Sequence, residues 1–352
     1  MNTPASQRCR ELDAVRGIAA VMVLLFHYTV RHAALFGDDA APFHVNHGFF
    51  GVEIFFGVSG FVILMTLERC RTPGDFVFAR CLRLYPAYWV AVATTFAILS
   101  VFPLAERTVT WPQALVNLTM LQEFLGVPHV DGVYWSLEVE LVFYVWMLAV
   151  FVVDGMRHMH RLIIGWLLLS LAALAATALA GRELPALPNR LLLIEHSPFF
   201  AIGAAAFVDF RAARVSRPTW LVFGLAPVAA WLAKGVEGIV VSLAMEVLFA
   251  LLVWRRAKFL DVRWLVFLGT VSYPLYLLHQ NIGYVIINGL RARHVDYGWA
   301  MLAATAASLA GACVLTFWIE RPIQRRCRAW REQRVARRRA VAAGTPRPAD
   351  GA

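Results

Sequence analysis

Long apolar stretches alternate with short polar segments along almost the whole chain. A helix that crosses the hydrocarbon core of a bilayer needs about 20 mostly apolar residues. The stretches are rich in Leu, Val, Ala and Phe and lack an alternation of apolar and charged positions, which favours helices over barrel strands. Ten such stretches can be marked, at residues 14–30, 48–67, 84–103, 133–153, 162–180, 193–209, 218–233, 238–254, 264–288 and 299–318. The pattern predicts an all-α, polytopic membrane protein with about ten transmembrane helices.

The boundary between the seventh and eighth stretches rests on very few residues. Lys234, Gly235 and Glu237 leave barely one turn between the two apolar segments. The predicted membrane domain covers residues 1–320 as a single unit. Residues 321–352 form a basic tail rich in Arg, Pro and Ala, which we expect to be disordered and cytoplasmic.

Composition excludes several classes of protein. Hydrophobic residues make up 60% of the chain and charged residues only 16%, with a mean hydropathy of +0.62. These values are not typical of a soluble globular, disordered or coiled-coil protein. The five cysteines fall in segments predicted to be cytoplasmic or within the last span, which argues against a secreted disulfide framework.

The distribution of basic residues sets the predicted orientation. Lys and Arg are retained on the cytoplasmic side of membrane proteins. With the amino terminus inside, 26 of the 33 basic residues fall in inner segments and 7 in outer ones. Both termini are therefore predicted to be cytoplasmic. Topology accounts for the net charge of +10 without a nucleic-acid partner.

Ionisable residues inside the predicted spans are the first candidates for chemistry, because each costs about 2.5–3.5 kcal/mol to insert near the bilayer centre. His27 lies 11 residues beyond Arg16. At 1.5 Å per residue this places it roughly 16 Å deeper in the membrane and on nearly the same helix face. An imidazole at that depth is a candidate general base.

Other helices bring further ionisable groups toward the same depth. Glu53 and Glu140 enter with the second and fourth predicted spans, and His279 with the ninth. Any one of them could be a structural hydrogen-bonding partner between helices. A carboxylate next to His27 would hold its tautomer, and the sequence leaves open whether Glu140 or Glu53 does so.

A pair of arginines marks the membrane boundary of the third span. Arg80 and Arg83 are spaced i, i+3 at the expected start of a helix, so they project the same way, and Arg suits bidentate binding of phosphate. They could equally be ordinary basic residues of an inner segment. The sequence lacks a zinc-protease signature, a Cys/His quartet, a P-loop and a dinucleotide fingerprint, so we expect no metal.

Several of these residues lie in strings that resemble the membrane-bound acyltransferase-3 family. The matches keep the same order along most of the chain. They are RELDAVRGIAAVMVLLFH (10–27), GVEIFFGVSGFVI (51–63), ARCLRLYPAYW (79–89), YWSLEVELVFY (134–144), PFFAIGAAAF (198–207), SYPLYLLHQ (272–280) and WIERP (318–322).

The resemblance implies roles for individual residues. His27, which follows Arg16 with ten residues between them, would be the catalytic base. Arg80 and Arg83 would contact an acyl-CoA donor, together with Arg16. The family pattern also points to functional or supporting roles for a further set, namely Ser136, Glu140, Tyr276 and His279. Glu53 stands where relatives often have Asp, which retains the charge.

The resemblance further implies an O-acyltransferase of a bacterial cytoplasmic membrane that moves an acyl group, usually acetyl, from cytosolic acyl-CoA to a carbohydrate or glycolipid hydroxyl. Only about 34 residues follow the last span, so this is expected to be the form without an extracytoplasmic esterase-like domain. The alternative is a secondary transporter or flippase in which buried His and Glu relay protons. The acceptor, the acyl chain length and whether the chain forms a homo-oligomer are left open.

Overall fold

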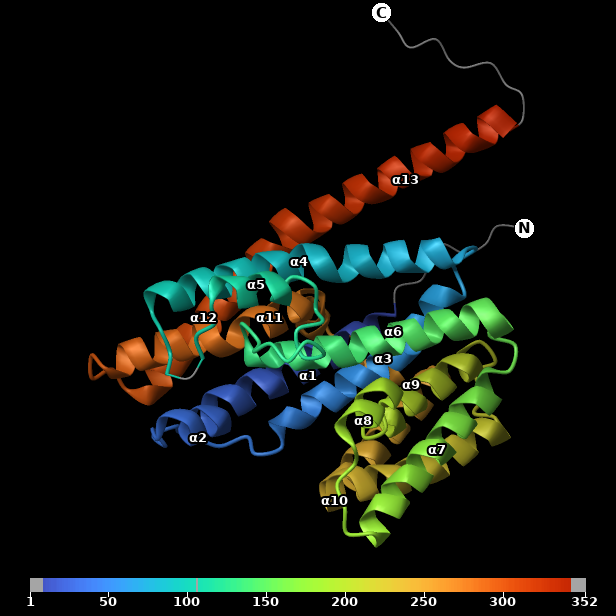
Figure 1. Ribbon diagram of the computed structural model, residues 1–352, viewed down its shortest axis with the longest axis horizontal. Coiled ribbons are helices and arrows are strands. Elements are labelled where there is room, and N and C mark those ends of the chain that lie inside the picture. Colours follow the sequence, from blue (N-terminus) through green and yellow to red (C-terminus); the bar gives the residue numbers. More distant parts are fainter. Residues whose placement is uncertain (1–8, 106, 343–352) are drawn as a thin grey trace, which may run out of the picture.

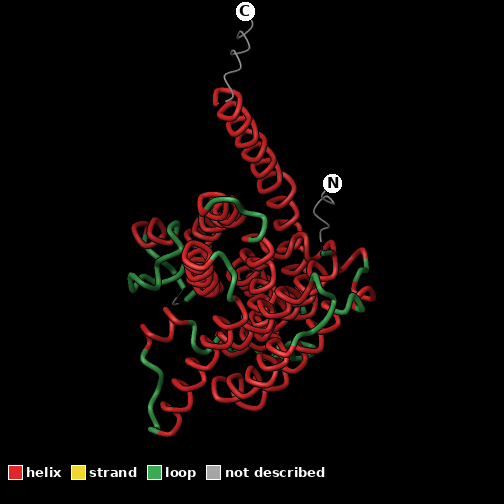
Figure 2. The backbone as a smooth tube through the Cα atoms, turned by 90° about the vertical axis from the view of Figure 1, so that its right-hand side faces the viewer, coloured by secondary structure: helices red, strands yellow, loops and turns green. Residues whose placement is uncertain are grey.

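The computed structural model describes residues 9–105 and 107–342. Helices joined by short loops make up this part of the chain, and no strand occurs in it (Figure 2). The α-helices are α1 (Arg10–Phe26), α2 (His32–Phe36), α3 (Gly51–Leu67), α4 (Pro73–Val101), α5 (Trp111–Asn117), α6 (Trp135–Asp154), α7 (Met159–Leu179), α8 (Ala186–Leu192), α9 (Ser197–Phe210), α10 (Arg217–Val253), α11 (Arg263–Arg291), α12 (Tyr297–Val314) and α13 (Arg321–Ala342). The all-α prediction is confirmed.

Within residues 9–105 and 107–342, eight helical segments are long and apolar enough to cross a membrane, which supports a multi-pass membrane protein. They include α1 continued through α2, and α8 continued through α9. Helix α11 is absent from these eight, although it spans 29 residues. Its middle carries Ser, Tyr, His, Gln and Asn side chains, all of them buried against other helices. Each of the ten predicted apolar stretches is largely helical, while the count of ten crossings and the side of each terminus stay predictions.

Helix α10 is a hairpin of two antiparallel arms. Gly235 has φ 68° and ψ −156°, a conformation open only to glycine, and it interrupts the helix at the predicted boundary. The arms fold back so closely that the rings of Trp220 and Trp254, at opposite ends of the segment, lie 6.4 Å apart. The short connection at Lys234 therefore separates two helices, as the sequence indicated.

Helix α4 begins earlier than its apolar stretch. Thr72 and Asp75 form a capping box, and Pro73 occupies the first turn. The helix thus starts 11 residues before the predicted position at 84. Arg80 and Arg83 lie well inside it and not at its start, which corrects the expectation drawn from hydropathy alone.

The tail also differs from the expectation of disorder. Residues Arg321–Ala342 form α13, which projects away from the bundle (Figure 1). Its first half stays close to α4, where Arg331 pairs with Asp75 and lies over the Phe78 ring. The final ten residues lie outside the described part of the chain. The cytoplasmic location of the tail remains a prediction.

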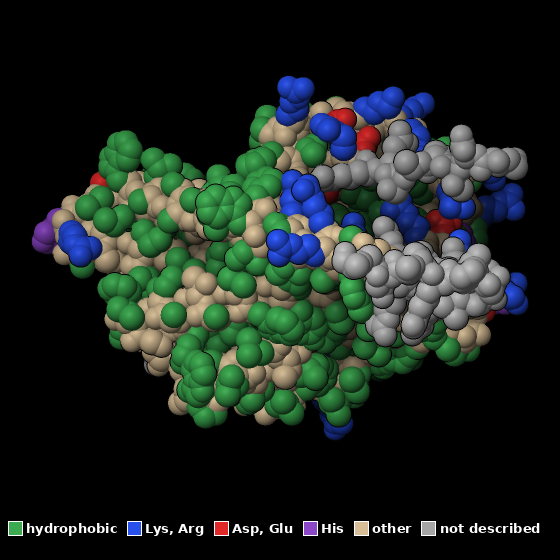
Figure 3. Space-filling model, turned by 90° about the horizontal axis from the view of Figure 1, so that it is seen from above, with side chains coloured by type: hydrophobic (Ala, Val, Ile, Leu, Met, Phe, Trp, Pro, Cys, Tyr) green, Lys and Arg blue, Asp and Glu red, His purple; other side chains and the backbone are tan. Residues whose placement is uncertain are grey.

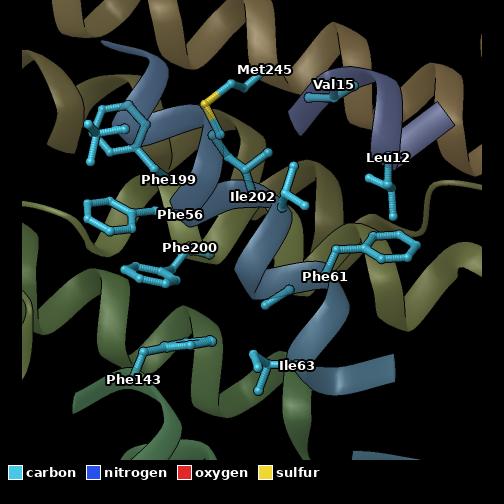
Figure 4. Close-up of a cluster of buried hydrophobic side chains, with 14 of the residues drawn as sticks. Leu12, Val15, Phe56, Phe61, Ile63, Phe143, Phe199, Phe200, Ile202 and Met245 are labelled. Carbon is cyan, nitrogen blue, oxygen red and sulfur yellow. The ribbon is translucent and has the colours of Figure 1, made fainter. Parts of the chain in front are cut away.

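The surface is mostly hydrophobic around the bundle, as a lipid-facing surface must be (Figure 3). On the face shown, most Lys and Arg side chains gather toward one end. Inside, aromatic side chains from α3, α6 and α9 form the core (Figure 4). The Phe200 ring stacks between those of Phe56 and Phe143, with centroid distances of 4.8 and 4.2 Å.

Glycines let four central helices approach closely. α1 packs between α11 and α3, and α3 packs in turn against α9 (Figure 1). A Cβ added to Gly203 of α9 would lie 1.8 Å from the Gly57 carbonyl oxygen of α3. One added to Gly269 of α11 would lie 1.7 Å from the Asp13 carbonyl oxygen of α1. Small residues at both contacts bring the polar residues of these helices within hydrogen-bonding range.

Gly203→Ala should destabilise the fold by about 1–3 kcal/mol, because the new methyl group must push α9 away from α3. Gly165→Ala on α7 is the matched control, since a Cβ there meets no atom within 4 Å. The free energy of unfolding of both purified variants can be measured in mixed micelles. Equal stability of the two variants would contradict the close α3–α9 contact.

Candidate active site

Two histidines from distant parts of the chain form a hydrogen-bonded pair. α1 ends at Phe26, and His27 opens a π-helix that runs from His27 to Arg31. Its Nδ1 lies 3.1 Å from Nε2 of His279, and the two ring centroids are 4.9 Å apart. His279 is only 1% exposed in the middle of α11. The pair thus joins α1 to α11 at their packed faces.

The surrounding carbonyls assign the tautomer of both rings. His279 Nδ1 lies 3.2 and 2.9 Å from the Leu275 and Tyr276 carbonyl oxygens, so it carries a proton and donates. Neutral His279 then has an acceptor lone pair at Nε2. His27 Nδ1 donates to that lone pair and to the Val23 carbonyl oxygen at 2.8 Å. Nε2 of His27 is therefore left unprotonated and able to accept a proton.

His27 lines a cavity of about 340 Å³, within the size range of small-molecule sites. We call it the histidine cavity. Glu53 of α3, Tyr276 of α11 and Trp135 at the start of α6 contribute to its wall. Its polar lining also includes Gln280 and three basic residues, which are Arg31, Arg107 and Lys234.

In the described part of the chain no carboxylate forms a hydrogen bond with His27, which corrects the sequence expectation. Among the described residues neither Glu53 nor Glu140 has a hydrogen bond to it. Glu53 is paired with Lys234, 3.1 Å from Oε1 to Nζ. Glu140 accepts hydrogen bonds of 2.7 Å from the hydroxyls of Ser59 and Tyr144. Both carboxylates are held by partners of their own, and a second histidine takes the orienting position.

Glu140 lines a second cavity of about 100 Å³, which we call the arginine cavity. Arg16, Arg80 and Arg83 all line it, as their predicted common role requires. Arg80 donates to Thr66 Oγ1 at 2.7 Å, and its guanidinium lies 5.6 Å from the Tyr144 ring centroid. Aromatic faces and hydroxyls thus hold a guanidinium fork in position at the cavity.

The three arginines differ in how far their charge is compensated. Arg83 pairs with Glu320, which is 3% exposed and lies at the end of the π-helix Leu315–Glu320. Arg80 is hydrogen-bonded only to a neutral hydroxyl, and Arg16 has no ion pair with a described carboxylate. An anionic ligand in this cavity would therefore meet Arg16 and Arg80, neither of which is in a salt bridge with a described carboxylate, while the charges of Asp13 and Glu140 also act on Arg16.

Val52 and Tyr276 separate the two cavities, because both residues line each of them. The Tyr276 hydroxyl donates to the Val133 carbonyl oxygen at 3.0 Å and shares a 2.6 Å hydrogen bond with Ser136 Oγ. Ser136 and Tyr276, both predicted site residues, therefore belong to the partition between the cavities. Of the other predicted residues, His27 and Glu53 line the histidine cavity, and Arg16, Arg80, Arg83 and Glu140 line the arginine cavity. His279 lines neither cavity and contacts His27 from behind.

Sequence reasoning missed two partners of the predicted site. The sequence places Lys234 in a short connection, and the structure shows that it reaches Glu53 from the tip of the α10 hairpin. Glu320 belongs to the string WIERP, which by itself gives it no role. A buried carboxylate next to a helix end was the available signal for Glu320, since such a group needs a cation nearby. For Lys234 the one-dimensional sequence held no comparable signal.

Comparison with known proteins identifies the family. Residues 10–320 match the profile described as acyltransferase domain, of the acyltransferase-3 type, which covers almost all of the described bundle. The chain belongs to this acyltransferase family. Membership in this family favours an enzyme over the transporter alternative. The chain is a multi-pass membrane O-acyltransferase.

Three relatives illustrate how far the similarity extends. The acyltransferase is 27% identical to the exopolysaccharide production protein ExoZ of Rhizobium meliloti (strain 1021), over 82% of its own length and 93% of that protein. It is 25% identical to nodulation protein 10 of Rhizobium leguminosarum bv. viciae, over 97% and 99% of the two chains. A match to protein 2 in the picA locus of Rhizobium radiobacter, 37% identical, spans 26% of the acyltransferase and 47% of that relative. No solved structure matches the chain.

Glu320→Ala in the acyltransferase should lower the free energy of unfolding by about 3–5 kcal/mol, because Arg83 would stay in the bundle without its counter-ion. The double variant Arg83→Met, Glu320→Leu should recover most of this loss. Arg211→Ala is the control, because Arg211 and Glu68 form an exposed ion pair. Removing that pair should lower the free energy of unfolding by no more than about 1 kcal/mol. If the single and double Glu320 variants were equally destabilised, the two residues would not be coupled.

Proposed function

We propose that this chain transfers an acyl group from acyl-CoA to a carbohydrate hydroxyl, with His27 as the general base. The observation that carries the proposal is the hydrogen bond from His27 Nδ1 to His279, which leaves Nε2 of His27 unprotonated in a residue that lines a cavity of substrate size. The name of one relative refers to exopolysaccharide production, which supports a carbohydrate or glycolipid acceptor.

The donor would bind on the side of the arginine cavity. The phosphates of CoA are the natural ligands of guanidinium forks, and Arg16 and Arg80 have charge available for them. Arg83 would act with them while its charge is shared with Glu320. The cavity is too small for a nucleotide, so only the narrow acyl-pantetheine arm would enter it, with the phosphates at its rim.

The acceptor hydroxyl would enter the histidine cavity and meet the thioester at the partition formed by Val52 and Tyr276. His27 Nε2 removes the hydroxyl proton as the oxygen attacks the thioester carbonyl carbon. The tetrahedral intermediate collapses with cleavage of the carbon–sulfur bond. The imidazolium returns its proton to the leaving thiolate, so that an ester and CoA thiol are the products.

His279 would serve as a positioning residue in this reaction. Its Nε2 accepts the Nδ1 proton of His27 and so fixes the basic tautomer toward the cavity. When His27 takes a second proton, the positive charge is stabilised by a neutral acceptor and the Val23 carbonyl, not by a carboxylate. The acyl group, expected to be acetyl, and the cytosolic origin of the donor are part of the proposal.

His27→Asn should reduce acceptor-dependent release of CoA thiol from acetyl-CoA by 10²–10⁴-fold, the typical contribution of a general base. Asn retains a short donor near the Val23 carbonyl, so folding should be preserved. His158→Asn, in an exposed loop, is the control. Thiol release is followed with a chromogenic disulfide. Turnover in His27→Asn equal to that of the control would refute the assigned base.

Arg80→Gln should raise the KM for acetyl-CoA at least tenfold with little change in kcat, because a charge-assisted hydrogen bond to phosphate contributes about 1.5–3 kcal/mol. With S-acetylpantetheine, which has no phosphate, wild type and variant should have the same KM. Arg161→Gln on the exposed surface of α7 is the control variant. An equal rise in KM for both donors would show that Arg80 supports the fold and does not bind phosphate.

A further inference from the structure

The histidine cavity is electrically unbalanced. Among the described residues that line it, three cationic side chains, those of Arg31, Arg107 and Lys234, face a single carboxylate, that of Glu53. They come from three different elements, namely the π-helix after α1, the loop that follows α4, and the tip of the α10 hairpin. The tertiary structure has therefore collected positive charge around the cavity that contains His27.

Only one of the three cations is matched by the cavity's carboxylate. Lys234 Nζ lies 3.1 Å from Oε1 of Glu53. The other carboxylate oxygen, Oε2, has no hydrogen-bond partner among the described residues, although Glu53 is only 2% exposed. A buried carboxylate oxygen without a donor is costly, and Glu53 lines the cavity, so a ligand hydroxyl that reached this atom would remove that cost.

Arg31 and Arg107 have no ion pair with any carboxylate of the described residues. Glu106 is not one of the described residues. Arg107 Nη1 donates to the neutral amide oxygen of Asn281 at 3.1 Å, and its guanidinium lies 5.5 Å from the Tyr284 ring centroid. Asp131 lies nearby but is occupied by the backbone N–H groups of Val133 and Asn281. Arg31 is exposed at the cavity rim. Both guanidinium groups retain donors for an anion.

We propose that the acceptor hydroxyl belongs to an anionic sugar, whose carboxylate or phosphate binds Arg31 and Arg107 while a neighbouring hydroxyl donates to Glu53. This inference rests on the proposed acyl transfer and specifies its acceptor. A neutral sugar would use the carboxylate but would leave both guanidinium forks without a matching group, whereas carboxylate and phosphate fit them bidentately.

The geometry also limits where the anionic group lies on the acceptor. Arg31 follows His27 by four residues in the same helical segment, so the two are neighbours on the helix surface, about 5–6 Å apart at Cβ. With His27 at the reacting hydroxyl, Arg31 reaches a group on the same sugar unit or the adjoining one. An anion several units away along a polysaccharide would not meet it.

Three glycosides test the proposal on purified, full-length protein in detergent. Methyl β-glucuronide carries a carboxylate, methyl β-glucoside 6-phosphate carries a phosphate, and methyl β-glucoside is neutral. Isothermal titration measures binding, and mass spectrometry of the glycoside measures acetyl transfer from acetyl-CoA. We expect at least one anionic glycoside to bind tenfold or more tightly than the neutral one. The tighter of the two identifies the anion.

The double variant Arg31→Gln, Arg107→Gln should lose this preference, so that all three glycosides bind like the neutral one. Arg293→Gln, an exposed arginine outside the cavity, is the matched control and should keep it. Equal binding of neutral and anionic glycosides by the wild type, or a preference that survives in the double variant, would overturn the proposal. Absence of any acetyl-CoA-dependent thiol release, with or without glycoside, would instead contradict the acyl transfer itself.

Discussion

The hydrogen bond between His27 and His279 is the contact on which the rest of the site depends. It ties α1 to α11, and through the carbonyls of Leu275 and Tyr276 it determines which nitrogen of each ring carries a proton. A carboxylate in the same position would hold the tautomer equally well but would bring a further charge into the bundle. A second neutral imidazole gives the orientation without that cost, which suits a site surrounded by apolar helices.

Close helix packing makes this contact available. Gly269 brings α11 against α1, and Gly203 brings α9 against α3, so the four helices form a continuous central layer. Polar side chains in this layer find partners across short distances, as Glu140 does with Ser59. The histidine and arginine cavities are what remains between the helices, and Tyr276 and Val52 divide them. The two cavities thus meet at one partition.

The two cavities use charge in different ways. In the arginine cavity Glu320 forms a salt bridge with one of the three guanidinium groups, that of Arg83, and Arg16 and Arg80 have no salt bridge to a described carboxylate. In the histidine cavity Lys234 engages half of the Glu53 carboxylate and leaves the other oxygen unpaired. Each cavity therefore combines a fixed ion pair with unsatisfied groups of defined chemistry. The fixed pairs maintain the shape, and the unsatisfied groups define what can bind.

By itself the sequence determined the helical class, the membrane setting and the positions of most site residues, because apolar runs and buried ionisable groups leave a one-dimensional signal. The family strings added roles for His27, Arg80 and Arg83. Only the tertiary structure decided that His279, and not Glu53 or Glu140, orients His27, since α1 and α11 are separated by more than 200 residues. The ion pairs of Lys234 with Glu53 and of Arg83 with Glu320 also join residues far apart in the sequence, so only the tertiary structure shows them. Hydropathy records how deep a residue lies along its helix, but the rotation and packing of helices decide which side chains meet.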